Sequence, residues 1–181
     1  STFIWNGPVW VSSYDDSQLA RYDVTSLVDI GLGGSESFAG QRYEVERWFI
    51  PSGDNEAKSA VFRFGYNAAN TSAGEIAIRL RGDAWSGYYF RIQDGEIVLV
   101  NDPNSVRVTL NTSMNCTLEF GAIDMLEGNG VWIYIKVDGE LKAGNVIARD
   151  ASYNTSRVSI YTNAEVNATL TDALDRVAVS Y

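Results

Sequence analysis

The sequence contains no histidine and only one cysteine, Cys116, among its 181 residues. Histidine is the commonest general base and a frequent metal ligand, so its absence excludes Ser-His-Asp, Cys-His and histidine-bound zinc sites. A single cysteine cannot form a disulfide within the chain. We therefore expect stability to come from packing, with Cys116 as a buried free thiol.

Positive charge and long apolar runs are also scarce. The chain has 14 Lys and Arg against 23 Asp and Glu, a net charge of −9. This balance argues against a nucleic-acid partner, because phosphate backbones are bound by an excess of cationic side chains. No run approaches the roughly 18 apolar residues of a transmembrane helix, so we expect no membrane insertion. The opening STFIWNG lacks signal-peptide features, and we expect a mature or trimmed chain.

Short runs of alternating apolar and polar residues fill the sequence, and five Trp, ten Tyr and seven Phe enrich it in strand-forming aromatics. We identify no helix. The alternation predicts strands at 8–13, 21–30, 42–50, 60–66, 75–81, 87–93, 96–101, 106–110, 116–122, 131–137, 140–147, 157–162, 166–170 and 174–181.

Two of the connections have clear turn sequences, since Asp94-Gly95 and Asp138-Gly139 each lie between strand-like runs and suit two-residue hairpins. No linker or long repeat divides the chain. We therefore expect one domain over residues 1–181. The number of strands predicts an all-β fold, a two-sheet antiparallel β-sandwich of jelly-roll type.

Four segments resemble the concanavalin A-like lectin and glucanase group, which includes laminin-G-like and carbohydrate-binding modules. They are GYYFRIQDGEIVLV (87–100), VWIYIKVDGELK (131–142), RVSIYTNAEVNATLTDAL (157–174) and DRVAVSY (175–181). The resemblance covers the strand pattern of roughly residues 42–181 and implies a concanavalin A-like sandwich whose last strand lies beside the first. It also implies a lectin-like or carbohydrate-binding function.

The catalytic motifs of that group are missing. Its glycoside hydrolases have a Glu-X-Asp-X-X-Glu strand, and here Glu44-Val45-Glu46 lacks both the central Asp and the third acid. Lyases of the fold combine His with Tyr, Arg and Gln. We therefore expect a non-catalytic protein, with a glycan-cleaving enzyme that uses Glu44 and Glu46 or a Tyr/Arg pair as a weaker alternative.

The alternation also predicts which side chains leave the core. Phe62, Phe64 and Tyr66 should be buried, as should the pairs Ile92 with Ile97 and Phe90 with Leu99. The opposite faces carry Arg79, Arg81, Tyr89, Arg91 and Gln93, with Arg63 on 60–66 and Glu44, Glu46 and Trp48 on 42–50. If these strands are neighbours in one sheet, they form a charged and aromatic ladder.

Such a ladder suits a glycan, because Arg and carboxylates hydrogen-bond hydroxyl groups while Trp and Tyr rings stack on pyranose C–H faces. Trp85 would lie at its rim. The alternative is that opposed Glu and Arg side chains only solvate the sheet. Trp132 and Tyr134 are ambiguous: they share a face opposite Val131, Ile133 and Ile135, but a hairpin pairing Ile135 with Lys142 and Lys136 with Leu141 blurs the assignment.

A second hypothesis rests on Arg81-Gly82-Asp83, which would suit an adhesion or assembly domain that binds a surface protein if it projects on a loop. An Arg81 buried in a strand ladder would remove that support. Under either hypothesis we expect an extracellular or cell-surface location.

Carbohydrate-binding jelly rolls often hold a structural calcium ion where the terminal strands meet. Calcium is a candidate here because carboxylates lie near both ends of the chain, at Asp15, Asp16, Asp172 and Asp175. Their spacing matches no D-X-D-X-D-G loop.

Overall fold

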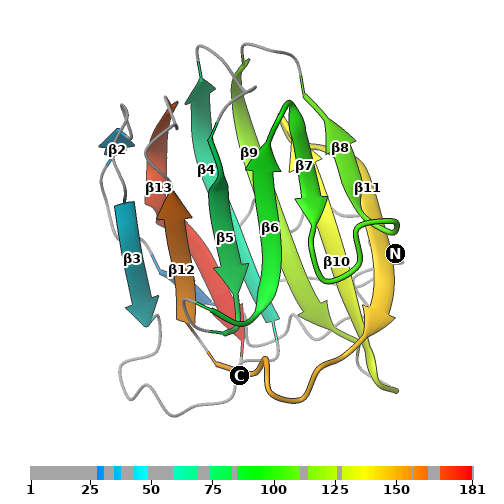
Figure 1. Cartoon of the computed structure of the whole chain (residues 1–181). Helices are drawn as coiled ribbons and strands as arrows, with labels where there is room; N and C mark the ends of the chain where they lie inside the picture. The colour runs from blue at the N-terminus through cyan, green and yellow to red at the C-terminus, as the bar shows by residue number, and fades with distance from the viewer. Residues whose placement is uncertain are drawn as a thin grey trace, which may run out of the picture.

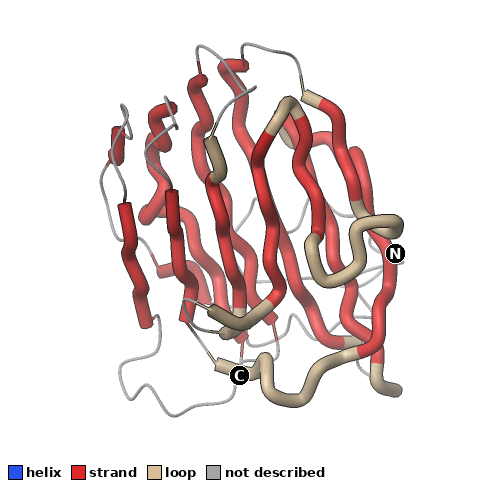
Figure 2. Tube along the Cα trace, in the orientation of Figure 1, coloured by secondary structure: helices blue, strands red, loops and turns tan. Residues whose placement is uncertain are grey.

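The computed structural model describes residues 28–30, 35–37, 43–48, 59–68, 74–82, 85–110, 114–125, 128–155, 157–162 and 168–180. Within 28–30, 35–37, 43–48 and 168–180 the description covers the backbone and its pairing. The described residues form strands, turns and bends and no helix (Figure 2), so none of them belongs to a helix that could cross a membrane.

Two antiparallel sheets lie face to face, with the smaller one in front in Figure 1. The larger has seven strands, in the order β1 (Val28–Ile30), β13 (Ala168–Ser180), β4 (Ser59–Ala68), β9 (Met114–Asp124), β10 (Gly130–Val137) and β11 (Glu140–Ala148), with β2 (Ser35–Ser37) paired to β13. The smaller has six, in the order β3 (Tyr43–Trp48), β12 (Arg157–Thr162), β5 (Ile76–Leu80), β6 (Tyr88–Gln93), β7 (Glu96–Leu99) and β8 (Arg107–Thr109). The predicted all-β sandwich of jelly-roll type is confirmed.

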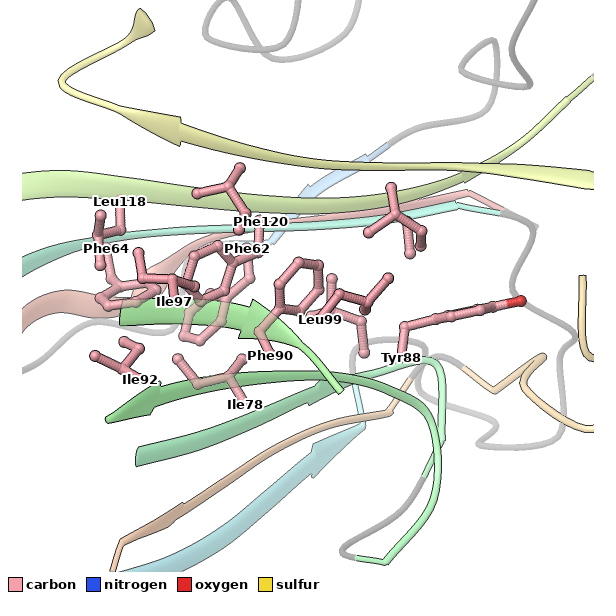
Figure 3. Close-up of a cluster of buried hydrophobic side chains, with 14 of the residues drawn as sticks. Phe62, Phe64, Ile78, Tyr88, Phe90, Ile92, Ile97, Leu99, Leu118 and Phe120 are labelled. Atoms are coloured by element: carbon pink, nitrogen blue, oxygen red, sulfur yellow. The ribbon is translucent and has the colours of Figure 1, made fainter. Parts of the chain in front are cut away.

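The core fills the space between the sheets with the apolar half of each alternating strand. Phe62 and Phe64 of β4 and Phe120 of β9 face Phe90 of β6 across the sandwich (Figure 3). The rings of Phe90 and Phe120 stack with centroids 4.5 Å apart, and so join the two sheets directly. The predicted burial of Phe62, Phe64 and Tyr66 and the pairs Ile92 with Ile97 and Phe90 with Leu99 are confirmed.

Both predicted Asp-Gly hairpins are present. Asp94 and Gly95 join β6 to β7 with φ of 51° and 73°, and Asp138 and Gly139 join β10 to β11 with φ of 51° and 79°. Positive φ at both central residues matches the twist of the flanking strands, which is why Asp-Gly is favoured here.

The second hairpin contains a β-bulge that the sequence did not reveal. Lys136 pairs with Leu141 as predicted, but Ile135 pairs with Ala143, because Lys142 is the extra residue between these pairs. The predicted pair of Ile135 with Lys142 was therefore wrong. The bulge resolves the ambiguity of β10, since Ile135 joins Val131 and Ile133 in the core while Trp132 and Tyr134 lie on the outer face.

The terminal regions differ most from the prediction. The two strands expected at 166–170 and 174–181 are one strand, β13, with a register shift between Thr171 and Arg176. A short strand, β2, occurs within the predicted loop 31–41. β13 lies beside β1, the first strand among the described residues. The strand predicted at 8–13 lies outside the described residues.

Candidate functional site

The outer face of the six-stranded sheet brings together most of the predicted ligand-binding residues. Backbone register aligns two rows across its strands: Glu46, Ser159, Arg79 and Tyr89 in one, and Glu44, Tyr161, Ala77 and Arg91 in the next. Paired residues in an antiparallel sheet point to the same side, so both rows face away from the core. We call this surface the front face.

Arg79 and Tyr89 form the centre of the front face. They are directly opposed on β5 and β6, and the Arg79 guanidinium carbon lies 4.1 Å from the centroid of the Tyr89 ring. This cation–π contact holds both side chains in one orientation. Both are half-buried, so the pair offers a preformed surface with aromatic and hydrogen-bonding parts.

Arg91 lies next to this pair on β6. Its direct cross-strand neighbours are Ala77 and Val98, both buried and small beside the long Arg91 side chain. Among the residues that the structure describes, Arg91 forms no salt bridge. Tyr161 of β12 occupies the same row beyond Ala77 and is half-buried. These groups can together donate hydrogen bonds to hydroxyl or acidic oxygens and stack on an apolar surface.

The predicted acidic positions lie at one edge of the front face. Glu44 and Glu46 occur on β3 opposite Tyr161 and Ser159, and Trp48 is opposite Arg157. The backbone therefore places all three on the same side as Arg79. Their side chains are outside the described part of the structure, so their role in binding stays a prediction.

Trp85 lies in the turn between β5 and β6 and is 80% exposed. Glycines tighten this turn: a Cβ on Gly82 would lie 2.1 Å from the Ser86 carbonyl oxygen, and Gly87 has a φ of 124°. Thr155 anchors the turn by donating from Oγ1 to the Gly82 carbonyl at 2.9 Å. An exposed indole is thus held at the end of the strands that carry Arg79 and Tyr89.

Three predicted residues lie on the other sheet, which corrects the single ladder that we expected. Strand β4 pairs with β9 and β13, so Arg63 belongs to the seven-stranded sheet rather than to the row of Arg79. Trp132 and Tyr134 of β10 also lie on this sheet's outer face. Alternation identified the outward side correctly for Arg79, Tyr89 and Arg91, but it could not show which sheet a strand joins. It was wrong for Arg81, which follows β5 with a φ of 65° and is buried.

The outer face of the seven-stranded sheet contains a polar cluster that the sequence analysis missed. Tyr134 donates a hydrogen bond to Glu119 Oε2 at 2.6 Å, and Lys136 Nζ lies 3.9 Å from the same oxygen. Burial raises the pKa of the Glu119 carboxyl, although Lys136, Tyr134 and Arg63 oppose the shift, and burial lowers the pKa of Lys136. The sequence signal that could have predicted this cluster is the alternation of Leu118, Glu119 and Phe120, which puts Glu119 on the side opposite the two apolar residues.

This cluster is inaccessible to a ligand. Tyr134 is 0% exposed, and Glu119 and Lys136 are also buried. The Tyr134 ring lies across Gly121 and the Trp132 ring across Gly144, where any Cβ would collide with the rings. We therefore place the candidate binding site on the front face.

The Arg81-Gly82-Asp83 motif does not present its arginine to solvent. Arg81 is 1% exposed and its Nη1 lies 2.7 Å from Asp124 Oδ1 on β9, in a buried ion pair that joins the two sheets. Asp83 lies outside the described residues. The condition for integrin-type recognition, a projecting Arg81, is not met.

The described residues contain no group of three or more Cys, Asp or Glu side chains that could hold a metal ion. Asp15 and Asp16 lie outside the described residues, and Asp172 and Asp175 occur in β13, whose side chains are not described. The structural calcium ion stays a prediction.

No protein-family model and no curated protein sequence matches this chain. Solved structures do match. The carbohydrate recognition domain of Emp46p in its potassium-bound form has a TM-score of 0.52 at 10% identity, covering 96% of this chain and 94% of that one. The binding domain of botulinum neurotoxin serotype C1 has a TM-score of 0.50 at 13% identity, covering 81% and 39%.

An exo-inulinase from Aspergillus awamori matches more weakly, with a TM-score of 0.46 at 10% identity, covering 82% of this chain and 29% of that one. At identities this low, similarity between structures shows a shared fold and nothing about function. Together with the two antiparallel sheets, these similarities show that the chain has a concanavalin A-like β-sandwich fold, as its strand sequences predicted.

Proposed function

We propose that this protein is a non-catalytic, lectin-like carbohydrate-binding module that binds an oligosaccharide on the front face. Arg79 and Tyr89 form its centre, with Arg91 beside them and Trp85 at the end of the strands. Glu44, Glu46 and Trp48 extend the site along β3. An extracellular or cell-surface location, where glycans are abundant, belongs to the same proposal.

The contact between Arg79 and Tyr89 is the observation that carries this proposal. A tyrosine ring fixed by a guanidinium presents an apolar surface to a pyranose ring, while the guanidinium N–H groups donate to neighbouring hydroxyls. Preorganisation matters because a ligand then loses less free energy to the ordering of side chains. The similarity of the fold to a carbohydrate recognition domain is consistent with this use of the sheet.

The absence of a matched catalytic motif supports a binding role rather than turnover. Glu44-Val45-Glu46 lacks the central Asp and the third acid of the Glu-X-Asp-X-X-Glu strand. Histidine, which could act as a general base, is absent from the chain. Incubation with polysaccharides should release neither reducing ends nor unsaturated products.

A glycan array followed by calorimetry tests the proposal. We expect an oligosaccharide ligand with millimolar to micromolar affinity and about a tenfold or greater loss of affinity in Tyr89→Ala. Tyr89→Phe, which keeps the ring, should retain most of the binding. Lys142→Ala on β11 is the control, because Lys142 is exposed at the edge of the other sheet.

Circular dichroism of each variant separates a loss of binding from a loss of fold. An array without any bound glycan, or a folded Tyr89→Ala protein that binds as tightly as the original, would contradict the proposed site.

A further inference from the structure

We propose that the preferred ligand of the front face is an anionic oligosaccharide, whose carboxylate or sulfate group binds Arg91. This inference rests on the proposed function and adds the chemical class of the ligand.

The distribution of charge is the first support. By register, the front face carries Arg79, Arg91, Arg107 and Arg157 against Glu44, Glu46 and Glu96. Glu75, the residue before β5, alternates onto the same side as Ala77 and Arg79 and adds a fourth acid. Four cations minus four anions give 0, whereas the whole chain has a net charge of −9, so the remaining residues sum to −9. The front face is thus a neutral area on an acidic protein, so an anion meets less electrostatic repulsion here than over the rest of the surface.

The environment of Arg91 is the second support. The cation at Arg107 lies 3.5 Å from Glu96, and Arg79 contacts the Tyr89 ring. Arg91 has no salt bridge within the described part of the chain, and its direct neighbours across both strands are the uncharged Ala77 and Val98. A half-buried guanidinium in this setting can direct its planar pair of N–H groups to an acidic oxygen of a ligand.

The acidic edge of the front face does not cancel this preference. Glu44 lies in the same row as Arg91 but three strands away, with Tyr161 and Ala77 between them. At the usual strand spacing this separation is about 14 Å, beyond the Debye length of roughly 8 Å at physiological salt. A chain of sugars lying across the strands would place neutral hydroxyl groups near Glu44 and its acidic group at Arg91.

Matched pairs of acidic and neutral glycans test the inference. The first pair is an oligogalacturonate and the same oligomer with its carboxyl groups reduced to hydroxymethyl groups, and the second is dextran sulfate and dextran. We expect the protein to bind at least one acidic member about tenfold or more tightly than its neutral partner, because charge-assisted hydrogen bonds exceed neutral ones. The preference should weaken as salt rises.

Substitutions of Arg91 test whether this residue causes the preference for acidic glycans. Arg91→Gln should abolish the preference for the acidic member. Arg91→Lys keeps the positive charge but lacks the planar pair of N–H groups, so it should keep part of the preference. Lys142→Gln makes the same change of net charge at the edge of the other sheet and should leave the preference intact.

The outcomes distinguish the two proposals. If the array shows binding of neutral glycans only, or if both members of each pair bind equally, the acidic preference is overturned while the proposed function stands. If no glycan binds in any set, both are overturned. Loss of the preference in Lys142→Gln as well would assign it to net charge and would overturn the role of Arg91.

Discussion

At the scale of single residues, Arg81 belongs to an Arg-Gly-Asp triplet, but its buried side chain has a structural role. Its guanidinium is held by Asp124 at 2.7 Å, and Arg149 reaches the other carboxylate oxygen at 3.3 Å. The Arg81 guanidinium carbon also lies 5.4 Å from the centroid of the Tyr88 ring. These contacts make Arg81 a link between β5 and β9, and so between the two sheets.

Replacing Arg81 should therefore destabilise the fold. We expect Arg81→Ala to lower the free energy of unfolding by about 3–5 kcal/mol, because it leaves the Asp124 carboxylate buried with only Arg149 to compensate. Urea denaturation measures this loss. Arg107→Ala is the matched control, since its ion pair with Glu96 is exposed and should contribute about 1 kcal/mol or less.

A further variant tests the cause. Arg81→Met combined with Asp124→Leu removes both charges and should recover much of the stability lost in Arg81→Ala. Equal losses in the Arg81→Ala and Arg107→Ala proteins would show that the buried pair is not a special link between the sheets.

At the scale of strands, the outer face of the seven-stranded sheet depends on glycines that make room for aromatic rings. Gly121 of β9 is paired with Tyr134 of β10, and a Cβ at Gly121 would lie 1.9 Å from Tyr134 Cε1. The missing side chain lets the tyrosine lie across the neighbouring strand and reach Glu119. A strand glycine usually weakens a sheet, but this one has a packing role.

We predict that Gly121→Ala lowers stability by about 1–3 kcal/mol through overpacking against Tyr134. Thermal or urea unfolding provides the measurement. Gly128→Ala is a useful comparison, because it has a φ of 84° but nothing within 4 Å of the new methyl group, so only backbone strain applies.

The double variant Gly121→Ala with Tyr134→Ala should lose less stability than the sum of the single variants, because the collision is absent from it. Strict additivity would show that the ring and the glycine are not coupled.

At the scale of the whole molecule, two buried core residues should make the free energy of unfolding fall as the solution becomes alkaline. Cys116 of β9 and Tyr66 of β4 are paired and buried between the sheets. Burial raises the pKa of the Cys116 thiol from 9.0 to about 11 and that of Tyr66 from 10.0 to about 12. Both groups therefore keep their protons in the folded protein at pH values where the unfolded chain loses them.

The sign of the effect follows from proton binding. Between pH 9 and about 11 the folded state binds more protons at Cys116 than the unfolded state, so stability falls as pH rises through this window. We expect Cys116→Ala to show a shallower decline between pH 8.5 and 10.5 in urea denaturation at fixed ionic strength. An identical decline in both proteins would show that Cys116 does not contribute.

The local structure of this protein could be predicted from its sequence. Alternation identified most strands and their buried sides, and the Asp-Gly pairs identified two hairpins, because each depends on residues close together in the chain. Arg79, Tyr89 and Arg91 could be recognised as outward-facing for the same reason, and their strands as neighbours because a short turn joins them.

The pairing of strands that are far apart in the sequence became visible only in the folded chain. Folding joined β12 to both β3 and β5, which put Glu44 and Glu46 in the rows of Arg91 and Arg79, and it assigned Arg63, Trp132 and Tyr134 to the other sheet. It also buried Arg81 against Asp124. The physical reason is that a period-two pattern fixes the direction of a side chain but contains no information about its distant partners.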